Sequence, residues 1–307
     1  MRRAVVSGVN GVIGRALLGV LARRGVEVLA LVRAGSPRNS DIPSHPGLRV
    51  EQCSLEQMAE LGAGWGQYDA FFHLAWQGTF GPGRSQVAAQ AANIAYTLDA
   101  VSLAGRLGCE VFVGVGSQAE YGPVAWGQAL TPSLCCRPKA VYGMAKLCAG
   151  QMSRVLCEQL GMRQVWGRVL SVYGPHDGEN TLIMSAISRF EGGLCGAFTK
   201  AEQYWDYLYA EDAARALYHM AKGGKHGSTY VIGSGQGRVL REYILELREI
   251  VNPSCELHFG ALPYAEHQPM YLRADLTALT ADTGFVPQVP FDEGVRRTLA
   301  WYKGSRE

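Results

Sequence analysis

The sequence of 307 residues contains no block of like charge, and charged residues make up only 18% of it. Acidic and basic residues are interspersed, and the formal net charge is +2. A groove for nucleic acid or a polybasic membrane patch needs clustered Lys and Arg side chains, so neither kind of partner is expected. A small molecule is the expected binding partner.

Long apolar runs are missing as well. None approaches the roughly 18 residues that a membrane-spanning helix needs. The basic and then apolar start of the chain is interrupted by glycine and asparagine before the apolar core of a signal peptide could form. We therefore expect no membrane segment.

No two cysteines have the CxxC spacing, and no cysteine stands at a metal-ligand spacing from a histidine. The eight cysteines lie mostly in apolar or helical stretches, at positions 53, 109, 135, 136, 148, 157, 195 and 255. Isolated thiols of this kind are typical of reduced cysteines in a cytoplasm. We expect a cytoplasmic protein without a metal site.

Hydrophobic residues make up 48% of the chain, enough for one large α/β domain or a main domain with a smaller lobe. Apolar runs that indicate strands alternate with stretches of helical periodicity. We expect strands at 4–6, 26–32, 48–50, 68–75, 110–115, 164–172, 204–209 and 229–232. We expect helices at 15–24, 84–107, 142–160, 180–190, 212–221, 240–251 and 291–302.

A glycine-rich turn separates the first expected strand from the first expected helix and contains Gly8, Gly11 and Gly14. Glycines there let the backbone turn tightly and approach a pyrophosphate, and the helix N-terminus offers free N–H groups to that anion. Val12 and Ile13 lie in the same turn and are expected to contact the cofactor. A glycine turn can serve packing alone, but at this place in the chain it indicates a dinucleotide site.

The second expected strand ends at Val32, where a site for NAD commonly has an acidic residue that binds the ribose 2′-hydroxyl. Valine cannot make that hydrogen bond. The adjacent Arg33 can pair with the 2′-phosphate of NADPH through its planar guanidinium, or it is only a solvated side chain at a strand end. We expect NADPH to be preferred, with NAD as the alternative cofactor.

Three residues of the middle strands and the long helix bear on the same site. Ala75 ends the strand at 68–75, where a dinucleotide would cross the sheet edge. His73, inside that apolar run, is expected to be a hydrogen-bonded core histidine. Asn93 lies in the middle of a helix, where asparagine is unfavourable unless its side chain has a partner, so we expect a structural role beneath the site.

Tyr142 and Lys146 lie four residues apart in an expected helix and therefore on one face of it. A lysine ammonium beside a tyrosine favours the phenolate and lowers the pKa of the phenol from its ordinary value of ~10. Such a phenol can act as a general acid, although a surface helix with one aromatic residue and one cation fits the pair equally well. Ser117 ends an apolar strand at the sheet edge where α/β sites form.

The glycine turn, Ser117 and the Tyr142–Lys146 pair together resemble the extended short-chain dehydrogenase/reductase family, in its nucleotide-sugar epimerase/dehydratase branch. Further motifs follow in the family's order, nearly end to end: His73-Leu74-Ala75, Asn93, Tyr121-Gly122, Arg168, Tyr173-Gly174-Pro175, Asp206-Tyr207 and Asp212. The resemblance implies a Rossmann doubly wound parallel sheet in residues 1–174 and 204–232. It implies a smaller substrate-binding lobe in 175–203 and 233–307, and a homodimer through the helices at 84–107 and 142–160.

By this resemblance Tyr142 is the general acid, Lys146 lowers the pKa of Tyr142 and holds the nicotinamide ribose, and Ser117 hydrogen-bonds the reacting oxygen. The substrate is a nucleotide sugar, and Gln118, Asn180 and Arg273 are its expected contacts.

Several positions depart from the family's pattern. Gln118 and Ala119 stand where dehydratases have Asp-Glu, and Ala119 also stands where fucose-type epimerase-reductases have cysteine. Trp205 replaces the Arg that grips the diphosphate in 4-epimerases, and Ser171 and Ser54 replace an Asn and an Asp.

We therefore expect an NADPH-dependent reductase of a nucleoside-diphosphate 4-keto-6-deoxy sugar. An NAD-dependent nucleotide-sugar epimerase is the alternative. From another class, a non-catalytic dinucleotide-binding sensor would need the glycine turn but no tuned phenol.

Overall fold

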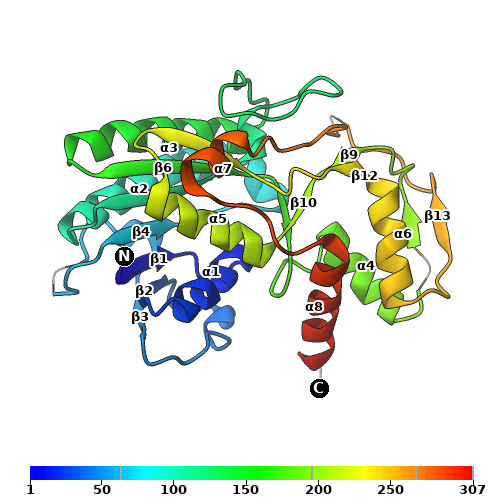
Figure 1. Ribbon diagram of the computed structural model, residues 1–307, viewed down its shortest axis with the longest axis horizontal. Coiled ribbons are helices and arrows are strands. Elements are labelled where there is room, and N and C mark those ends of the chain that lie inside the picture. Colours follow the sequence, from blue (N-terminus) through cyan, green and yellow to red (C-terminus); the bar gives the residue numbers. More distant parts are fainter. Residues whose placement is uncertain (63, 195, 267, 306–307) are drawn as a thin grey trace.

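The computed structural model describes residues 1–62, 64–194, 196–266 and 268–305. A sheet of seven strands forms its centre, and every pairing given for that sheet is parallel (Figure 1). In space the strands follow the order β3-β2-β1-β4-β5-β6-β11. The predicted doubly wound parallel sheet is confirmed. Its strands are β1 (Arg3–Ser7), β2 (Glu27–Val32), β3 (Leu48–Gln52), β4 (Ala70–His73), β5 (Val111–Ser117), β6 (Arg163–Val169) and β11 (Ser228–Ile232).

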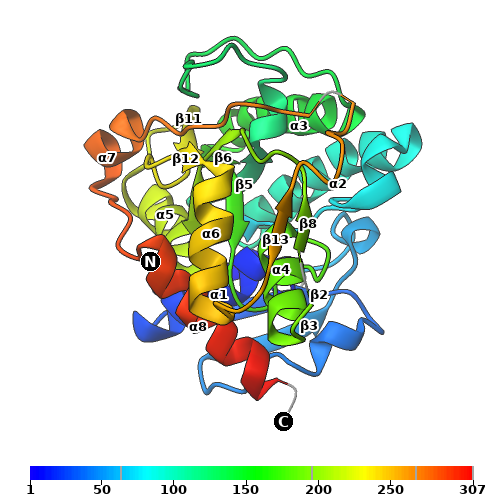
Figure 2. The same ribbon diagram turned by 90° about the vertical axis from the view of Figure 1, so that its right-hand side faces the viewer.

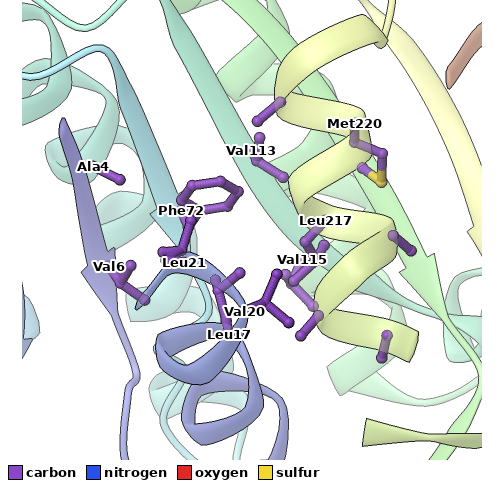
Figure 3. Packing of buried hydrophobic residues seen from close by; sticks show 14 of the residues in the cluster. Ala4, Val6, Leu17, Val20, Leu21, Phe72, Val113, Val115, Leu217 and Met220 are labelled. Atoms are coloured by element: carbon purple, nitrogen blue, oxygen red, sulfur yellow. The ribbon is translucent and has the colours of Figure 1, made fainter. Parts of the chain in front are cut away.

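Helices cover both faces of this sheet, which is why its inner strands read as apolar runs. On one face lie α1 (Val12–Arg23) and α5 (Ala210–Gly223), and on the other lie α2 (Val87–Arg106) and α3 (Val141–Gln159). Figure 3 shows Leu17 and Leu21 of α1 and Leu217 of α5 packed toward Phe72 and Val113 of the sheet. Each fully buried side chain of this size contributes about 1.5–3 kcal/mol to folding.

Figure 2 shows a group of elements beside the sheet, in the part of the chain expected to form the smaller lobe, and these elements enclose a second hydrophobic core. It is formed by α4 (Leu182–Glu191), α6 (Leu240–Val251) and α8 (Phe291–Gly304), next to the paired strands β8 (Gly196–Phe198) and β13 (Leu257–Phe259). Ile187, Phe190, Leu247 and Val295 are fully buried there. The short strands β7 (Ser171–Tyr173) and β10 (Tyr207–Tyr209) pair with each other, as do β9 (Tyr204–Trp205) and β12 (Arg238–Val239).

The single strand predicted at 204–209 is wrong, because Asp206 divides it into β9 and β10, which pair with different partners. The Asp206 carboxylate is fully buried and accepts N–H bonds from Ser234, Gly235 and Ala274 at 2.7, 3.0 and 3.0 Å. A carboxylate satisfied in this way turns inward and interrupts the strand. The predicted strand at 164–172 is also divided, after Val169.

Helix α7 (Thr277–Thr283) was not predicted. It lies within residues 233–307, which the sequence analysis assigns to the smaller lobe. Leu279 of α7 and the nearby Phe285 lie in the hydrophobic core of the main sheet. This part of the chain therefore returns to the sheet. The proposed division into two domains stays a prediction.

The seven cysteines within the described ranges are free thiols, and Cys195 lies outside those ranges. Over the same ranges, no helix combines enough length with enough hydropathy to cross a membrane.

Candidate active site

The glycine turn packs directly against the chain that leaves β4. Gly8 has a φ of +80°, and a Cβ on it would lie 2.6 Å from the backbone nitrogen of Ala75. A Cβ on Gly14 would lie 2.2 Å from the carbonyl oxygen of Gly8. Only glycine fits at these two positions, so the turn brings α1 and Ala75 together at the carboxyl edge of the sheet.

Helix α1 begins at Val12 with Gly11 as its N-cap, with no side-chain cap and no acidic residue in its first turn. The N–H groups of this first turn, including those of Val12 and Ile13, donate no capping hydrogen bond to an N-cap side chain. They are therefore suited to bind an anion. The turn therefore fits the pyrophosphate of a dinucleotide.

Arg15, on the same helix, is a buried arginine that the sequence analysis did not select. Its Nη2 donates to the carbonyl oxygen of Arg38 at 2.6 Å, whereas its buried Nε and Nη1 have no hydrogen-bond partner among the described residues. Burial lowers the pKa of Arg15. Unpaired buried donors on a cation are costly, so phosphate oxygens would be favourable partners here. Arg33 is exposed nearby, and its carbonyl oxygen accepts the Asn39 side chain at 2.9 Å.

Lys146 and Tyr142 project from the first turns of α3 and are both buried. The Lys146 Nζ donates to the carbonyl oxygen of Val115 on β5 at 2.7 Å and lies 3.7 Å from the centre of a Trp76 ring. Burial lowers the pKa of Lys146 to about 7. The Lys146 side chain is therefore held against β5.

The phenol of Tyr142 differs from the expectation in one respect. Burial raises its pKa, and the charge of Arg84 and a side-chain hydrogen bond with Ser117 oppose that rise. The Lys146 Nζ is 5.9 Å from the Tyr142 ring centre, whereas the Arg84 guanidinium carbon is 4.0 Å from it. In this structure the Arg84 guanidinium lies closer to the Tyr142 ring than the Lys146 ammonium does, and its charge favours the phenolate.

Beneath Ser117, a buried carboxylate holds the end of β5. The Ser117 N–H donates to Glu120 Oε1 at 2.8 Å, and the indole of Trp166 donates to the same oxygen at 3.1 Å. The Arg168 Nε donates to Glu120 Oε2 at 2.7 Å. Glu120 is fully buried, so this network fixes where Ser117 lies relative to Tyr142.

The loop after β4 is held by two side chains of α2. The Asn93 Oδ1 accepts the Gln77 N–H at 2.8 Å, as expected for a mid-helix asparagine with a partner. Gln90, which is fully buried, donates to the carbonyl oxygens of Gly78 and Gly83 and accepts from the Trp76 indole at 2.9 Å. This clamp turns residues 81–85 into a short 3₁₀ segment, η3 (Gly81–Ser85), so α2 begins only at Val87.

His73 at the end of β4 is buried, and its Nδ1 shares a 2.9 Å hydrogen bond with the Ser7 hydroxyl. Burial lowers the pKa of His73 to about 3, so the ring is neutral. This agrees with the expected role as a hydrogen-bonded core histidine.

The expected substrate contacts lie in separate segments. Gln118 follows Ser117 directly and is half-buried, whereas Asn180 and Arg273 are exposed. The two departures Trp205 and Ser171 form a pair, because the Trp205 indole donates to the Ser171 hydroxyl at 2.8 Å.

Sequence reasoning missed Trp76, Arg84, Gln90, Glu120 and Arg15 as parts of this site. Only the mid-helix Asn93 pointed toward the clamp. Gln90, three residues before Asn93, carried the same signal of a polar residue within an apolar helix.

Known proteins are similar to most of this chain in sequence and fold. The sequence profile of the NAD dependent epimerase/dehydratase family matches residues 4–233. A dTDP-glucose 4,6-dehydratase of Escherichia coli is 26% identical over 57% of this chain and 50% of that protein, so the chain spans about half the length of such curated relatives. A CDP-abequose synthase of Salmonella typhimurium is 25% identical over 96% of each chain.

The fold is also that of a solved UDP-glucose 4-epimerase of Thermotoga maritima, with a TM-score of 0.88, 22% identity, and coverage of 99% of this chain and 100% of that chain. With its glycine turn, its Ser117–Tyr142–Lys146 arrangement and the profile match over most of its length, the chain belongs to the NAD-dependent epimerase/dehydratase family, a family of extended short-chain dehydrogenase/reductase enzymes.

Proposed function

We propose that this enzyme is an NADPH-dependent 4-ketoreductase of a nucleoside-diphosphate 4-keto-6-deoxy sugar. Bound NADPH supplies the hydride. Tyr142 donates the proton to the carbonyl oxygen of the sugar, and the Ser117 hydroxyl hydrogen-bonds that oxygen as negative charge develops on it. Lys146 holds the nicotinamide ribose.

The observation that carries this proposal concerns the carboxylates near Ser117. The dehydratase pair is missing, and the nearby Glu120 is buried. Elimination of water, as in the dehydratases, needs a second acid and base near the sugar. The dehydratase Asp-Glu pair is replaced by Gln118 and Ala119. Glu120 is fully buried and engaged by Arg168 and Trp166, so its carboxylate faces away from a substrate. One proton donor, Tyr142, is sufficient for reduction of a ketone.

We also propose a preference for NADPH, which would support a reductase over an epimerase, because a reductase draws on the NADPH pool while an epimerase recycles a bound NAD. Val32 offers no acceptor to a ribose 2′-hydroxyl and no charge that would repel a 2′-phosphate. Arg33 and the two Arg15 nitrogens that have no partner among the described residues are the donors proposed for that phosphate.

The Arg33→Ala variant is expected to bind NADPH about ten- to hundredfold more weakly, since a charge-assisted pair is worth about 1.5–3 kcal/mol. Its affinity for NADH should change little. Isothermal titration of both cofactors against wild type, Arg33→Ala and Arg15→Gln measures this preference. Equal and small losses for both cofactors in Arg33→Ala would mean that Arg33 is only a solvated side chain.

For the substrate, Gln118, Asn180 and Arg273 remain the proposed contacts. The Trp205–Ser171 pair occupies the two positions where 4-epimerases of the family carry Arg and Asn, so the diphosphate must be held in another way. Relatives are named for dTDP and CDP sugars. Thymidine and cytidine diphosphate sugars are therefore the first substrates to test.

The alternative is an NAD-dependent nucleotide-sugar epimerase, and the nucleotide that co-purifies with the protein separates the two. A reductase is expected to be isolated free of nucleotide or with loosely bound NADP(H) that dialysis removes. Tightly bound NAD that survives dialysis would favour the epimerase. A non-catalytic sensor would bind dinucleotide but turn over neither substrate.

Two further proposals concern the whole protein. Helix α3 exposes Met144, Met152 and Val155 on the side away from the sheet, and a homodimer through α2 and α3 would cover them. A cytoplasmic location stays a prediction.

A further inference from the structure

Arg84 lies on the face of the phenol that we propose as the general acid. Its guanidinium carbon is 4.0 Å from the centre of the Tyr142 ring. The Trp76 ring meets Tyr142 from another side, with the ring centres 6.1 Å apart and the planes at 81°. The loop after β4 thus supplies two groups that enclose the phenol.

One hydrogen bond holds the Arg84 side chain, and another holds the backbone just before it. Its Nη1 donates to the carbonyl oxygen of Thr79 at 3.1 Å. The carbonyl oxygen of the preceding Gly83 accepts from the Gln90 side chain at 2.9 Å. These contacts restrict the half-buried Arg84 side chain where it lies over the Tyr142 ring.

The charged groups around the phenol come from three segments. Arg84 lies on η3, Lys146 on α3, and Glu120 on the 3₁₀ segment η4 (Gln118–Glu120). Lys146 is bound to Val115, and Glu120 is bound to Arg168. His73, whose charge would be felt by Lys146, is neutral. Arg84 is therefore the cation best placed to act on the phenol.

We infer that Arg84 is a positioning residue for the general acid: its guanidinium holds the Tyr142 ring by the face and stabilises the phenolate that remains after proton transfer. This inference rests on the proposed role of Tyr142. In the step concerned, the O–H bond of Tyr142 breaks, its proton joins the carbonyl oxygen of the sugar, and the carbonyl carbon receives the hydride of NADPH, which is oxidised to NADP⁺. The negative charge left on Tyr142 then lies beside the Arg84 cation.

The sign of the expected pH effect follows from this geometry. Tyr142 must be protonated to donate, so activity falls at high pH as the phenol loses its proton. Removing Arg84 raises the pKa of the phenol, which keeps it protonated to higher pH but makes it a weaker acid. In an enzyme without Arg84, the rate on the plateau of the pH profile should therefore fall. The upper limb of the profile, where activity is lost as Tyr142 deprotonates, should move to higher pH.

The test compares Arg84→Gln, Arg84→Lys and wild type with NADPH and the ketone substrate. Arg84→Gln is expected to lower kcat at neutral pH by about tenfold and to move the upper limb of kcat/KM upward by about one pH unit or more. Arg84→Lys, which keeps a cation, should return the limb toward its wild-type position. Arg24→Gln is the matched control, because Arg24 lies 4.3 Å from the Tyr218 ring centre, far from the site, and its loss should leave both quantities unchanged.

Two results would overturn the inference. A rise in KM with an unmoved upper limb would make Arg84 a substrate-binding residue, and unchanged kinetics would give it no role. Circular dichroism and NADPH binding verify that each variant is folded. If Arg84→Gln does not fold, the comparison of Arg84→Lys with wild type still tests the inference.

A second readout needs no substrate. Among the 14 tyrosines, the ¹³C signal of Tyr142 in ¹³C-tyrosine protein is the one lost in Tyr142→Phe. That signal should titrate at higher pH in Arg84→Gln than in wild type, and an identical titration would contradict the inference. If no keto sugar is reduced, the proposed function fails, while this titration still tests Arg84.

Discussion

The Tyr142→Phe variant is expected to lose about 10²–10⁴-fold in kcat, the usual contribution of general acid catalysis, while it folds and binds cofactor like wild type. The substitution removes only the hydroxyl group. The ring still contacts Arg84 and Trp76, so the packing of the site should persist. Steady-state kinetics together with NADPH titration measure both parts of the expectation.

Tyr218→Phe provides the control for Tyr142→Phe. Tyr218 also has an arginine over its ring, but it lies on α5, on the other face of the sheet. It should keep full activity. If Tyr142→Phe retained a near-normal kcat, Tyr142 would not be the proton donor.

The second large effect is expected in stability. Arg168→Met should lower the free energy of unfolding by about 3–5 kcal/mol, because it leaves the fully buried Glu120 carboxylate without its cation. The Arg168–Glu120 ion pair has a 2.7 Å contact and side-chain exposures of 8% and 1%. Urea unfolding of the purified variant gives the value.

The double variant Arg168→Met/Glu120→Gln removes both charges and should be less destabilised than Arg168→Met alone. Arg297→Met is the control, since the Arg297–Glu293 pair is 45% exposed on each side and should contribute no more than about 1 kcal/mol. A loss in Arg168→Met as small as in Arg297→Met would show that the buried pair is unimportant for stability.

Features that depend on local spacing were predictable from the sequence. The glycine turn follows from the strand and helix beside it, and Tyr142 and Lys146 share a helix face because they are four residues apart. The parallel sheet follows from apolar strands that alternate with helices. These patterns need only neighbours along the chain.

Features that depend on contacts between distant segments were not predictable. Arg84 was expected inside a helix, but Gln90 and Asn93 bind the backbone before α2 and bend it into η3. Asp206 divides a strand because Ser234 and Ala274 approach it from elsewhere in the chain. The contact of Lys146 with the Val115 carbonyl oxygen was also not predictable, because it joins α3 to β5.

The same distinction applies to function. The family is established by motifs that lie along most of the chain, whereas the reaction depends on a few departures, such as Gln118 and Ala119. The structure adds that Glu120 is bound to Arg168 and that Trp205 is bound to Ser171. The buried Glu120 supports the proposal of a site with one proton donor, and the Trp205–Ser171 pair bears on how the diphosphate is held.

The most direct test of the proposed reduction uses NADPH that carries deuterium at the transferable position of the nicotinamide. The purified enzyme is incubated with dTDP- and CDP-linked 4-keto-6-deoxy sugars, and NADPH oxidation is compared with product formation. A 4-ketoreductase should oxidise one NADPH for each product and place the deuterium on C4 of the sugar. Epimerisation of 4-hydroxy nucleotide sugars tested in parallel, without net NADPH oxidation and without deuterium in the product, would contradict the proposal and identify an epimerase.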